Sequence, residues 1–244
     1  LGGGLQSSGA VAPGLSPGIL TVDGSYTQHA GGSLEIEIGG LSSGTEHDQL
    51  EVVGATTLTG ALSVSLLDGF VPQDGHTFTI LTAAEIHGSF STRSLPPLPA
   101  GLGWSVLLQP TAVVLAVSPD SDGDGVGDIG DCAPADPSAH DTPGEVAGLA
   151  FGADKETLSW TSQAAWAGGG TVYDVVRGLT SALPVGGAGE TCLLSASATP
   201  QVVDQDLPEV GTSFYYLVRA TNACGVGSYG TSTSGAPRMT GACP

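Results

Sequence analysis

The sequence predicts an all-β protein, because its composition and the spacing of its apolar residues both favour short strands joined by tight turns. Among 244 residues there are 39 glycines and 16 prolines, and Val, Thr, Ser and Leu are frequent. Glycine and proline form turns, whereas β-branched residues favour strands. Apolar residues make up 40% of the chain, which is enough to fill a core and argues against disorder. A chain of this length can form two domains.

The first predicted domain, residues 1–118, contains a repeated unit of short strands. Segment 20–27 followed by 32–39 matches segment 50–57 followed by 60–66. Apolar residues alternate within each unit, so one face of each strand is expected to be buried. The alternating residues are Leu34, Ile36, Ile38, Leu62, Val64 and Leu66. Glycine-bounded strands repeated at this period indicate a β-solenoid, or β-helix, whose rungs stack. Further strands are expected at 77–82, 104–108 and 112–117.

Two parts of this domain carry a more specific pattern. The first part is Gly-Ala-Val-Ala-Pro-Gly-Leu-Ser-Pro-Gly-Ile-Leu-Thr-Val at 9–22, with further matching runs at 26–28 and 32–36. The second is Gly-Phe-Val-Pro at 69–72 with Phe-Thr-Ile-Leu at 78–81. Over about residues 9–118, the pattern resembles the last rungs of bacterial autotransporter-type β-helix passengers. The resemblance implies a β-helix that serves as a stalk or adhesin, and it implies no activity.

An aspartate-rich segment, predicted as a calcium-binding linker over 119–143, follows this domain. Residues 120–131 read Asp-Ser-Asp-Gly-Asp-Gly-Val-Gly-Asp-Ile-Gly-Asp. Alternate aspartates can turn their carboxylates toward one hard cation, and Gly125 permits the sharp turn that lets a backbone carbonyl join them. Calcium suits such a flexible set of ligands better than magnesium. The plain alternative is a solvated acidic linker. The predicted ligands are Asp120, Asp122, Asp124, Asp128 and Asp131.

The aspartate-rich loop resembles two known calcium-binding motifs. It is similar at its start to an EF-hand loop, but its twelfth position is Asp131 where an EF-hand has Glu. It resembles the thrombospondin type 3 calcium repeat more closely, because there the closing aspartate is followed by cysteine, as Asp131 is by Cys132.

The last region, 144–244, is predicted to be a β-sandwich. Strands are expected at 145–149, 157–160, 172–177, 193–195, 201–203 and 214–220. Short strands at this spacing indicate an immunoglobulin-like sandwich, which has about seven strands. The string from Leu207-Pro208 through Phe214, Tyr216, Val218, Ala220 and Asn222 resembles the fibronectin type III pattern, with Phe214 where a tyrosine usually stands. From Asp120 onward the chain resembles the calcium-repeat-plus-sandwich tails of predicted secreted bacterial proteins.

Four cysteines, all in the second half, predict two disulfides. No Cys-x-x-Cys pair is present. An even number in an acidic chain rich in Thr, Ser and Gly indicates an oxidising compartment, so we expect an extracellular or bacterial cell-surface location. A fibronectin-like strand order would bring Cys132 near Cys224 at one pole and Cys192 near Cys243 at the other. Those are the two expected bridges.

Charge and composition narrow the classes of function. The net charge of −19 argues against a nucleic-acid partner and an anionic membrane surface, and no apolar run is long enough to span a bilayer. Residues 1–119 contain one basic residue, Arg93, so a lyase or hydrolase on the predicted solenoid is not expected. Trp104 and Trp160 are expected in the core and Trp166 in an exposed loop. The histidines are expected to be surface polar residues: His29, His47, His76, His87 and His140.

Three classes of function remain open. The first is a non-enzymatic extracellular structural protein stiffened by calcium, as a filament subunit or a surface stalk or adhesin. The alternative is a carbohydrate-binding accessory module, which would require exposed aromatic residues; the third is a remnant of a secreted enzyme. Partners would be further copies of the chain, surface glycans or other surface proteins. Head-to-tail self-association is expected because residues 1–5, Leu-Gly-Gly-Gly-Leu, offer no cap to a first rung. The alternative to self-association is that the sequence was trimmed to the ordered part of a longer protein.

Overall fold

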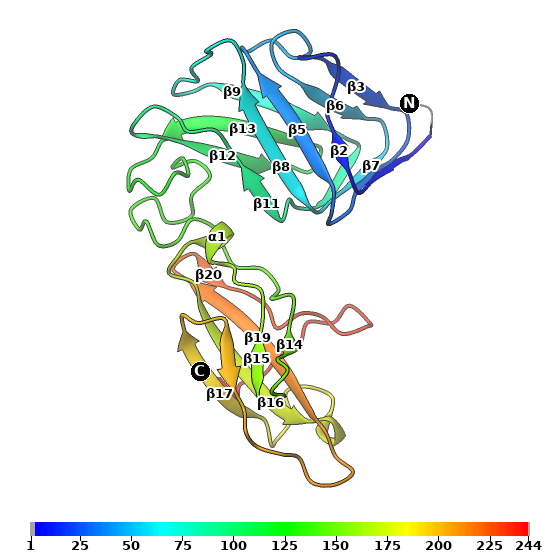
Figure 1. Ribbon diagram of the computed structural model, residues 1–244, viewed down its shortest axis with the longest axis vertical. Helices are drawn as coiled ribbons and strands as arrows, with labels where there is room; N and C mark the ends of the chain where they lie inside the picture. The colour runs from blue at the N-terminus through cyan, green and yellow to red at the C-terminus, as the bar shows by residue number, and fades with distance from the viewer. Residues whose placement is uncertain (1–2, 244) are drawn as a thin grey trace. The chain divides into compact units, whose positions relative to one another are not determined.

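The computed structural model describes residues 3–243 and is built almost entirely of strands (Figure 1). Strands hold 41% of residues and helices 3%, so the predicted all-β class is confirmed. The chain forms two compact units, Leu1–Ala135 and Asp136–Pro244. Their boundary lies inside the predicted linker, and the aspartate-rich residues 120–131 belong to the first unit. Leu1 and Gly2, part of the expected uncapped end, lie outside the described residues.

In the first unit, successive strands belong in turn to three different sheets (Figure 1). The first sheet has the order β1 (Leu5–Ser7), β4 (Tyr26–Gln28), β7 (Ala55–Leu58) and β10 (Glu85–Gly88). The second has the order β2 (Ala10–Val11), β5 (Ser33–Ile38), β8 (Ala61–Leu66) and β11 (Thr92–Ser94). The third begins with β3 (Ile19–Val22), β6 (Gln49–Val52) and β9 (Thr77–Thr82). All of these neighbours pair in parallel.

Parallel pairing in register explains the sequence repeat. Leu20 lies beside Leu50, and Leu34 lies beside Leu62. Equivalent apolar side chains therefore stack in one continuous core, and the predicted alternation is confirmed there. Each fully buried Leu or Ile contributes about 1.5–3 kcal/mol to the free energy of folding. The stacked set includes Val22, Leu34, Ile36, Ile38, Leu50, Leu58, Leu62 and Ile80.

The parallel stacking ends at an antiparallel hairpin. Strand β13 (Ala112–Pro119) pairs antiparallel with both β9 and β12 (Leu102–Leu108), which completes the third sheet. Trp104 of β12 is buried as predicted, with its ring 6.0 Å from that of Phe78 and its Nε1 donating to the Pro96 carbonyl over 2.9 Å. The aspartate-rich segment follows β13 directly.

The loop between β5 and β6 corrects one prediction. His47, expected on the surface, is 2% exposed and packs edge-on against Phe78. An antiparallel bridge to Ile38 returns the loop to the end of β5, which brings the imidazole into the core. Burial lowers the pKa of His47. The neighbouring Asp48 carboxylate accepts hydrogen bonds from the Gly18 and Glu37 backbone amides, over 2.7 and 2.9 Å.

The second unit has two antiparallel sheets (Figure 1). The smaller has the order β14 (Ala150–Phe151), β15 (Thr157–Ser159) and β18 (Gln201–Val203). The larger has the order β17 (Thr191–Ser197), β16 (Val172–Leu179), β19 (Phe214–Asn222) and β20 (Gly225–Val226). The connections include α1 (Ala164–Ala167) and a 3-10 turn at Thr180–Ala182. Both sheets contribute to one core, which contains Leu158, Trp160, Tyr173, Val175, Val218 and Ala220.

Two predicted features of this unit are wrong. A strand was expected at 145–149, but Gly148 takes a φ of 72°, so only Glu145 makes an isolated bridge and β14 begins at Ala150. Trp166, expected in an exposed loop, is half-buried on α1. The start of α1 is fixed because the backbone amide of Gln163 donates to the Tyr173 hydroxyl over 2.7 Å.

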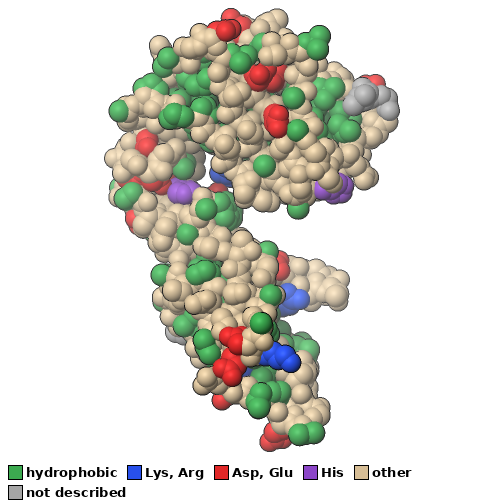
Figure 2. Space-filling view, viewed as in Figure 1, with side chains coloured by type: hydrophobic (Ala, Val, Ile, Leu, Met, Phe, Trp, Pro, Cys, Tyr) green, Lys and Arg blue, Asp and Glu red, His purple; other side chains and the backbone are tan. Residues whose placement is uncertain are grey.

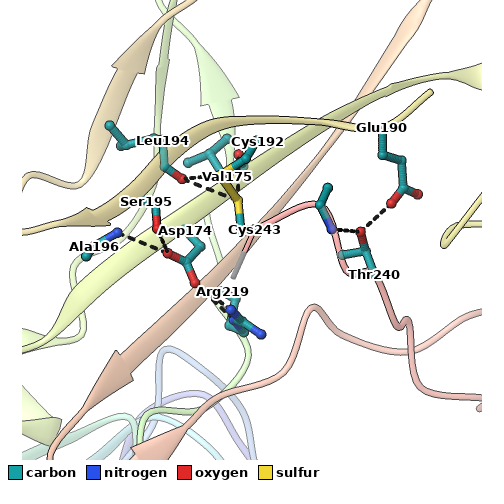
Figure 3. The surroundings of a disulfide bond; sticks show 11 residues. Asp174, Val175, Glu190, Cys192, Leu194, Ser195, Ala196, Arg219, Thr240 and Cys243 are labelled. Atoms are coloured by element: carbon teal, nitrogen blue, oxygen red, sulfur yellow. Dashed lines mark hydrogen bonds and ion pairs between the residues drawn. A yellow bond between two sulfur atoms is a disulfide. The ribbon is translucent and has the colours of Figure 1, made fainter. Parts of the chain in front are cut away.

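The structure contains the predicted disulfide between Cys192 and Cys243 (Figure 3). Next to it, the Asp174 carboxylate accepts hydrogen bonds from Arg219 and from the Ser195 hydroxyl, over 2.6 and 3.1 Å. These contacts join β16, β17 and β19. The other expected bridge, between Cys132 and Cys224, would connect residues of the two units and stays a prediction.

Candidate metal site

The aspartate-rich segment is held in place by the hairpin that precedes it. The Gly127 amide donates to the Trp104 carbonyl over 3.2 Å, and the buried Ser105 hydroxyl donates to the Gly127 carbonyl over 3.1 Å. A Cβ on Gly103 would lie 2.5 Å from the carbonyl carbon of Val126, so this approach requires glycine. The middle of the segment is therefore fixed against β12.

Three of the five predicted ligands converge. One carboxylate oxygen from each of Asp120, Asp122 and Asp124 lies within 4.8 Å of the others. The chain turns through Gly123 and Gly125, whose φ angles of 80° and 96° disfavour other residues. The amides of these two glycines donate to the two oxygens of Asp120, over 2.8 and 3.0 Å. The backbone thus orients the first carboxylate before any cation binds.

Two carboxylate oxygens near this turn are buried without a hydrogen-bond donor in the described structure. They are Asp122 Oδ2 and Asp131 Oδ2. Asp131 is 8% exposed, and its other oxygen accepts from the Ala133 amide over 2.7 Å. A buried charged oxygen without a partner lowers stability, unless a cation or a donor compensates it. A bound cation among the three converging carboxylates would supply that compensation for Asp122, so this group fits a metal ion, whereas Asp131 is not part of the group.

The remaining predicted ligand has a different local role. Asp128 accepts from the Ser121 amide over 2.9 Å and from the Ser121 hydroxyl over 2.7 Å, one bond at each oxygen. It therefore braces the loop instead of joining the group of three. Sequence spacing could not separate Asp128 from the others, because the distinction depends on the serine hydroxyl.

The electrostatics of the three carboxylates favour a divalent ion. Two unit charges 4.8 Å apart repel by about 3 kcal/mol at an effective dielectric of about 20, before salt screening. Residues 120–145 contain eight acidic residues and no Lys or Arg. On the face seen in Figure 2, most of the basic side chains lie on the second unit, beside acidic ones. Neutralisation of the three carboxylates is therefore expected from a cation in solution.

Comparisons with known proteins add no relative. No protein-family model, curated protein or solved structure matches the chain. Among the described residues, no helix is long and apolar enough to cross a membrane. The function must therefore be argued from the chemistry of the sites themselves.

Proposed function

We propose that the protein is a non-enzymatic extracellular structural protein, a surface stalk or adhesin, whose first unit is a β-solenoid stabilised by calcium. The three stacks of parallel strands support the solenoid. The orders β14-β15-β18 and β17-β16-β19-β20 support a fibronectin type III-like sandwich in the second unit.

One observation carries the calcium proposal. The carboxylates of Asp120, Asp122 and Asp124 converge within 4.8 Å, and the second oxygen of Asp122 is buried with no hydrogen-bond donor. Calcium takes six to eight oxygen ligands in flexible geometry, and carboxylates, backbone carbonyls and water can all contribute. Asp131 lies close in sequence and would add a further buried oxygen if the loop tightened around the ion.

Calcium titration tests this proposal directly. Calorimetric titration into chelator-treated protein should show binding to the natural chain, and Asp122→Asn should weaken it at least about tenfold, equivalent to about 1.4 kcal/mol. Asp23→Asn is the matched control, because Asp23 is exposed in the same unit and follows β3, which lies at the opposite edge of the third sheet from β12, where the loop is anchored. Equal calcium affinity in all three proteins would contradict the assignment.

Head-to-tail self-association is the second part of the structural role. Its support is that β1, β2 and β3 each form an edge strand of their sheet among the described residues, so their outer backbone groups could pair with another copy. The experiment is negative-stain imaging of the protein in calcium at micromolar concentration. Fibres are expected. Discrete particles of single-chain mass would contradict a filament and leave the stalk role.

A further inference from the structure

The second unit has an open pocket of about 310 Å³ at one end of its two sheets. Its walls come from β14, the turn between β14 and β15, the segment that follows β18, and β19. Three aromatic rings form one side: Phe151, Phe214 and Tyr216. Phe151 and Tyr216 meet edge-on with ring centroids 5.3 Å apart, and Phe214 meets Tyr216 in the same way at 6.4 Å. These contacts make a fixed aromatic surface.

Phe151 is the unusual member of this surface. It is 45% exposed, although phenylalanine is a residue type that is usually buried. Its ring is nevertheless held by Tyr216, so a ligand that stacks on it would order no mobile side chain. Such preorganisation favours binding.

A network of ion pairs, centred on the largely buried Arg177 and Asp204, lies beside the aromatic rings. Arg177 donates from Nη1 to both oxygens of Asp204, over 2.7 and 2.9 Å, and from Nη2 to Asp206 over 2.9 Å. The guanidinium also lies 4.4 Å from the centre of the Phe214 ring. The Tyr216 hydroxyl donates to Asp204 over 2.9 Å; burial and this bond raise the pKa of Tyr216 to about 12. Asp204 is therefore fully occupied by protein donors.

The rim is polar and faces solvent. The Asp206 side chain is 69% exposed while Arg177 fixes its position. Gln205 donates from Nε2 to Glu156 over 3.1 Å, which orients its amide. Glu156 and the exposed Lys155 lie on a turn that Asp154 braces by accepting from the Thr157 amide and hydroxyl. The rim thus holds fixed hydrogen-bonding groups beside the aromatic rings.

The charge balance indicates the class of ligand. Among the lining residues, Lys155 opposes Glu156, Asp204 and Asp206, a formal charge of −2, and Arg177 beside the lining reduces it to −1 by pairing with the two aspartates. An anion is disfavoured there, and a cation gains little, because Asp204 and Asp206 are already paired with Arg177. A neutral polyol does fit, because a sugar ring has an apolar C–H face for the aromatic rings and hydroxyls for carboxylate and amide groups.

We infer that this pocket binds a neutral sugar residue of a glycan, through stacking on Phe151, contact with Tyr216 and hydrogen bonds to Gln205 and Asp206. The pocket lies wholly within the second unit. Sugar binding is therefore independent of the calcium proposal, and it would make the protein a glycan-binding adhesin.

The test uses the full chain on an array of neutral, anionic and cationic glycans, followed by calorimetry with the best-bound neutral oligosaccharide. Phe151→Ala and Gln205→Ala should each weaken binding at least about tenfold. Met239→Ala, another exposed apolar residue of the same unit, should leave it unchanged. Binding should persist in chelator and in Asp122→Asn, which separates this site from the calcium site.

Three results would overturn the inference. They are the absence of binding to any neutral glycan, equal binding by the natural chain and Phe151→Ala, and binding restricted to charged glycans. Circular dichroism of each variant verifies that it is folded. Because Phe151 is at the surface of a two-residue strand, its replacement should leave the second unit folded.

Discussion

Calcium removal is expected to lower the melting temperature of the first unit and to expose residues 120–135 to proteolysis. An ion present at a hundred times its dissociation constant stabilises the folded state by about 2.7 kcal/mol. For a unit of this size, the melting temperature should fall by roughly 5–10 °C in chelator. The three carboxylates would then repel one another without compensation, so the loop that Gly127 and Ser105 anchor to β12 should loosen.

Differential scanning calorimetry and limited digestion measure these two effects. The segment contains no Lys or Arg, so the protease should be one that cuts after small apolar residues, such as elastase. In Asp122→Asn, chelator should change the melting temperature little, because the site is already weakened. In Asp23→Asn the full shift should remain. If chelator alters neither melting nor cleavage in the natural chain, the three aspartates form only a solvated acidic loop.

The sequence predicted those strands well in which apolar residues alternate strongly. Strands β9 and β18 begin and end where the pattern placed them. The repeat also predicted the register, since Leu20 lies beside Leu50. The expected strand at 145–149 failed because one glycine with a positive φ, Gly148, interrupts a run whose side chains otherwise suit a strand.

The parts of the candidate sites that are made by residues close together in the sequence could be predicted. The parts that depend on contacts between distant residues could not. The convergence of Asp120, Asp122 and Asp124 follows from alternation around glycine, and it was predicted. The anchor at Ser105 lies 22 residues from Gly127, and no local pattern connects them. The aromatic pocket could not be predicted for the same reason: Phe151 and Tyr216 lie on strands of different sheets and meet only in the folded unit. For the same reason, His47 was misplaced, since its burial depends on Phe78.

Loss of the Cys192–Cys243 disulfide is expected to produce the largest single change in the second unit. The bridge spans 51 residues, and a cross-link of that span contributes about 4 kcal/mol through the reduced entropy of the unfolded chain. It also holds the segment after β20, which contains no strand of its own. Through Cys243 and Tyr229 this segment covers Val176 and Leu217, on the face of the larger sheet opposite the main core.

Urea unfolding of the full-length Cys192→Ser/Cys243→Ser variant tests this expectation. The transition of the second unit should move to lower urea by an amount equivalent to about 4 kcal/mol, and its slope should steepen, because the unfolded chain without the cross-link exposes more surface. Hydrogen exchange should speed up in β16 and β19, which lie under the released segment, while exchange in β5 and β8 of the first unit stays constant. Tyr229→Ala should be measured alongside it, because this variant removes the ring that covers Val176 but keeps the disulfide. If the double variant unfolds within about 0.5 kcal/mol of the natural chain, residues 227–243 are held by packing on Tyr229 alone, and the disulfide has no structural role.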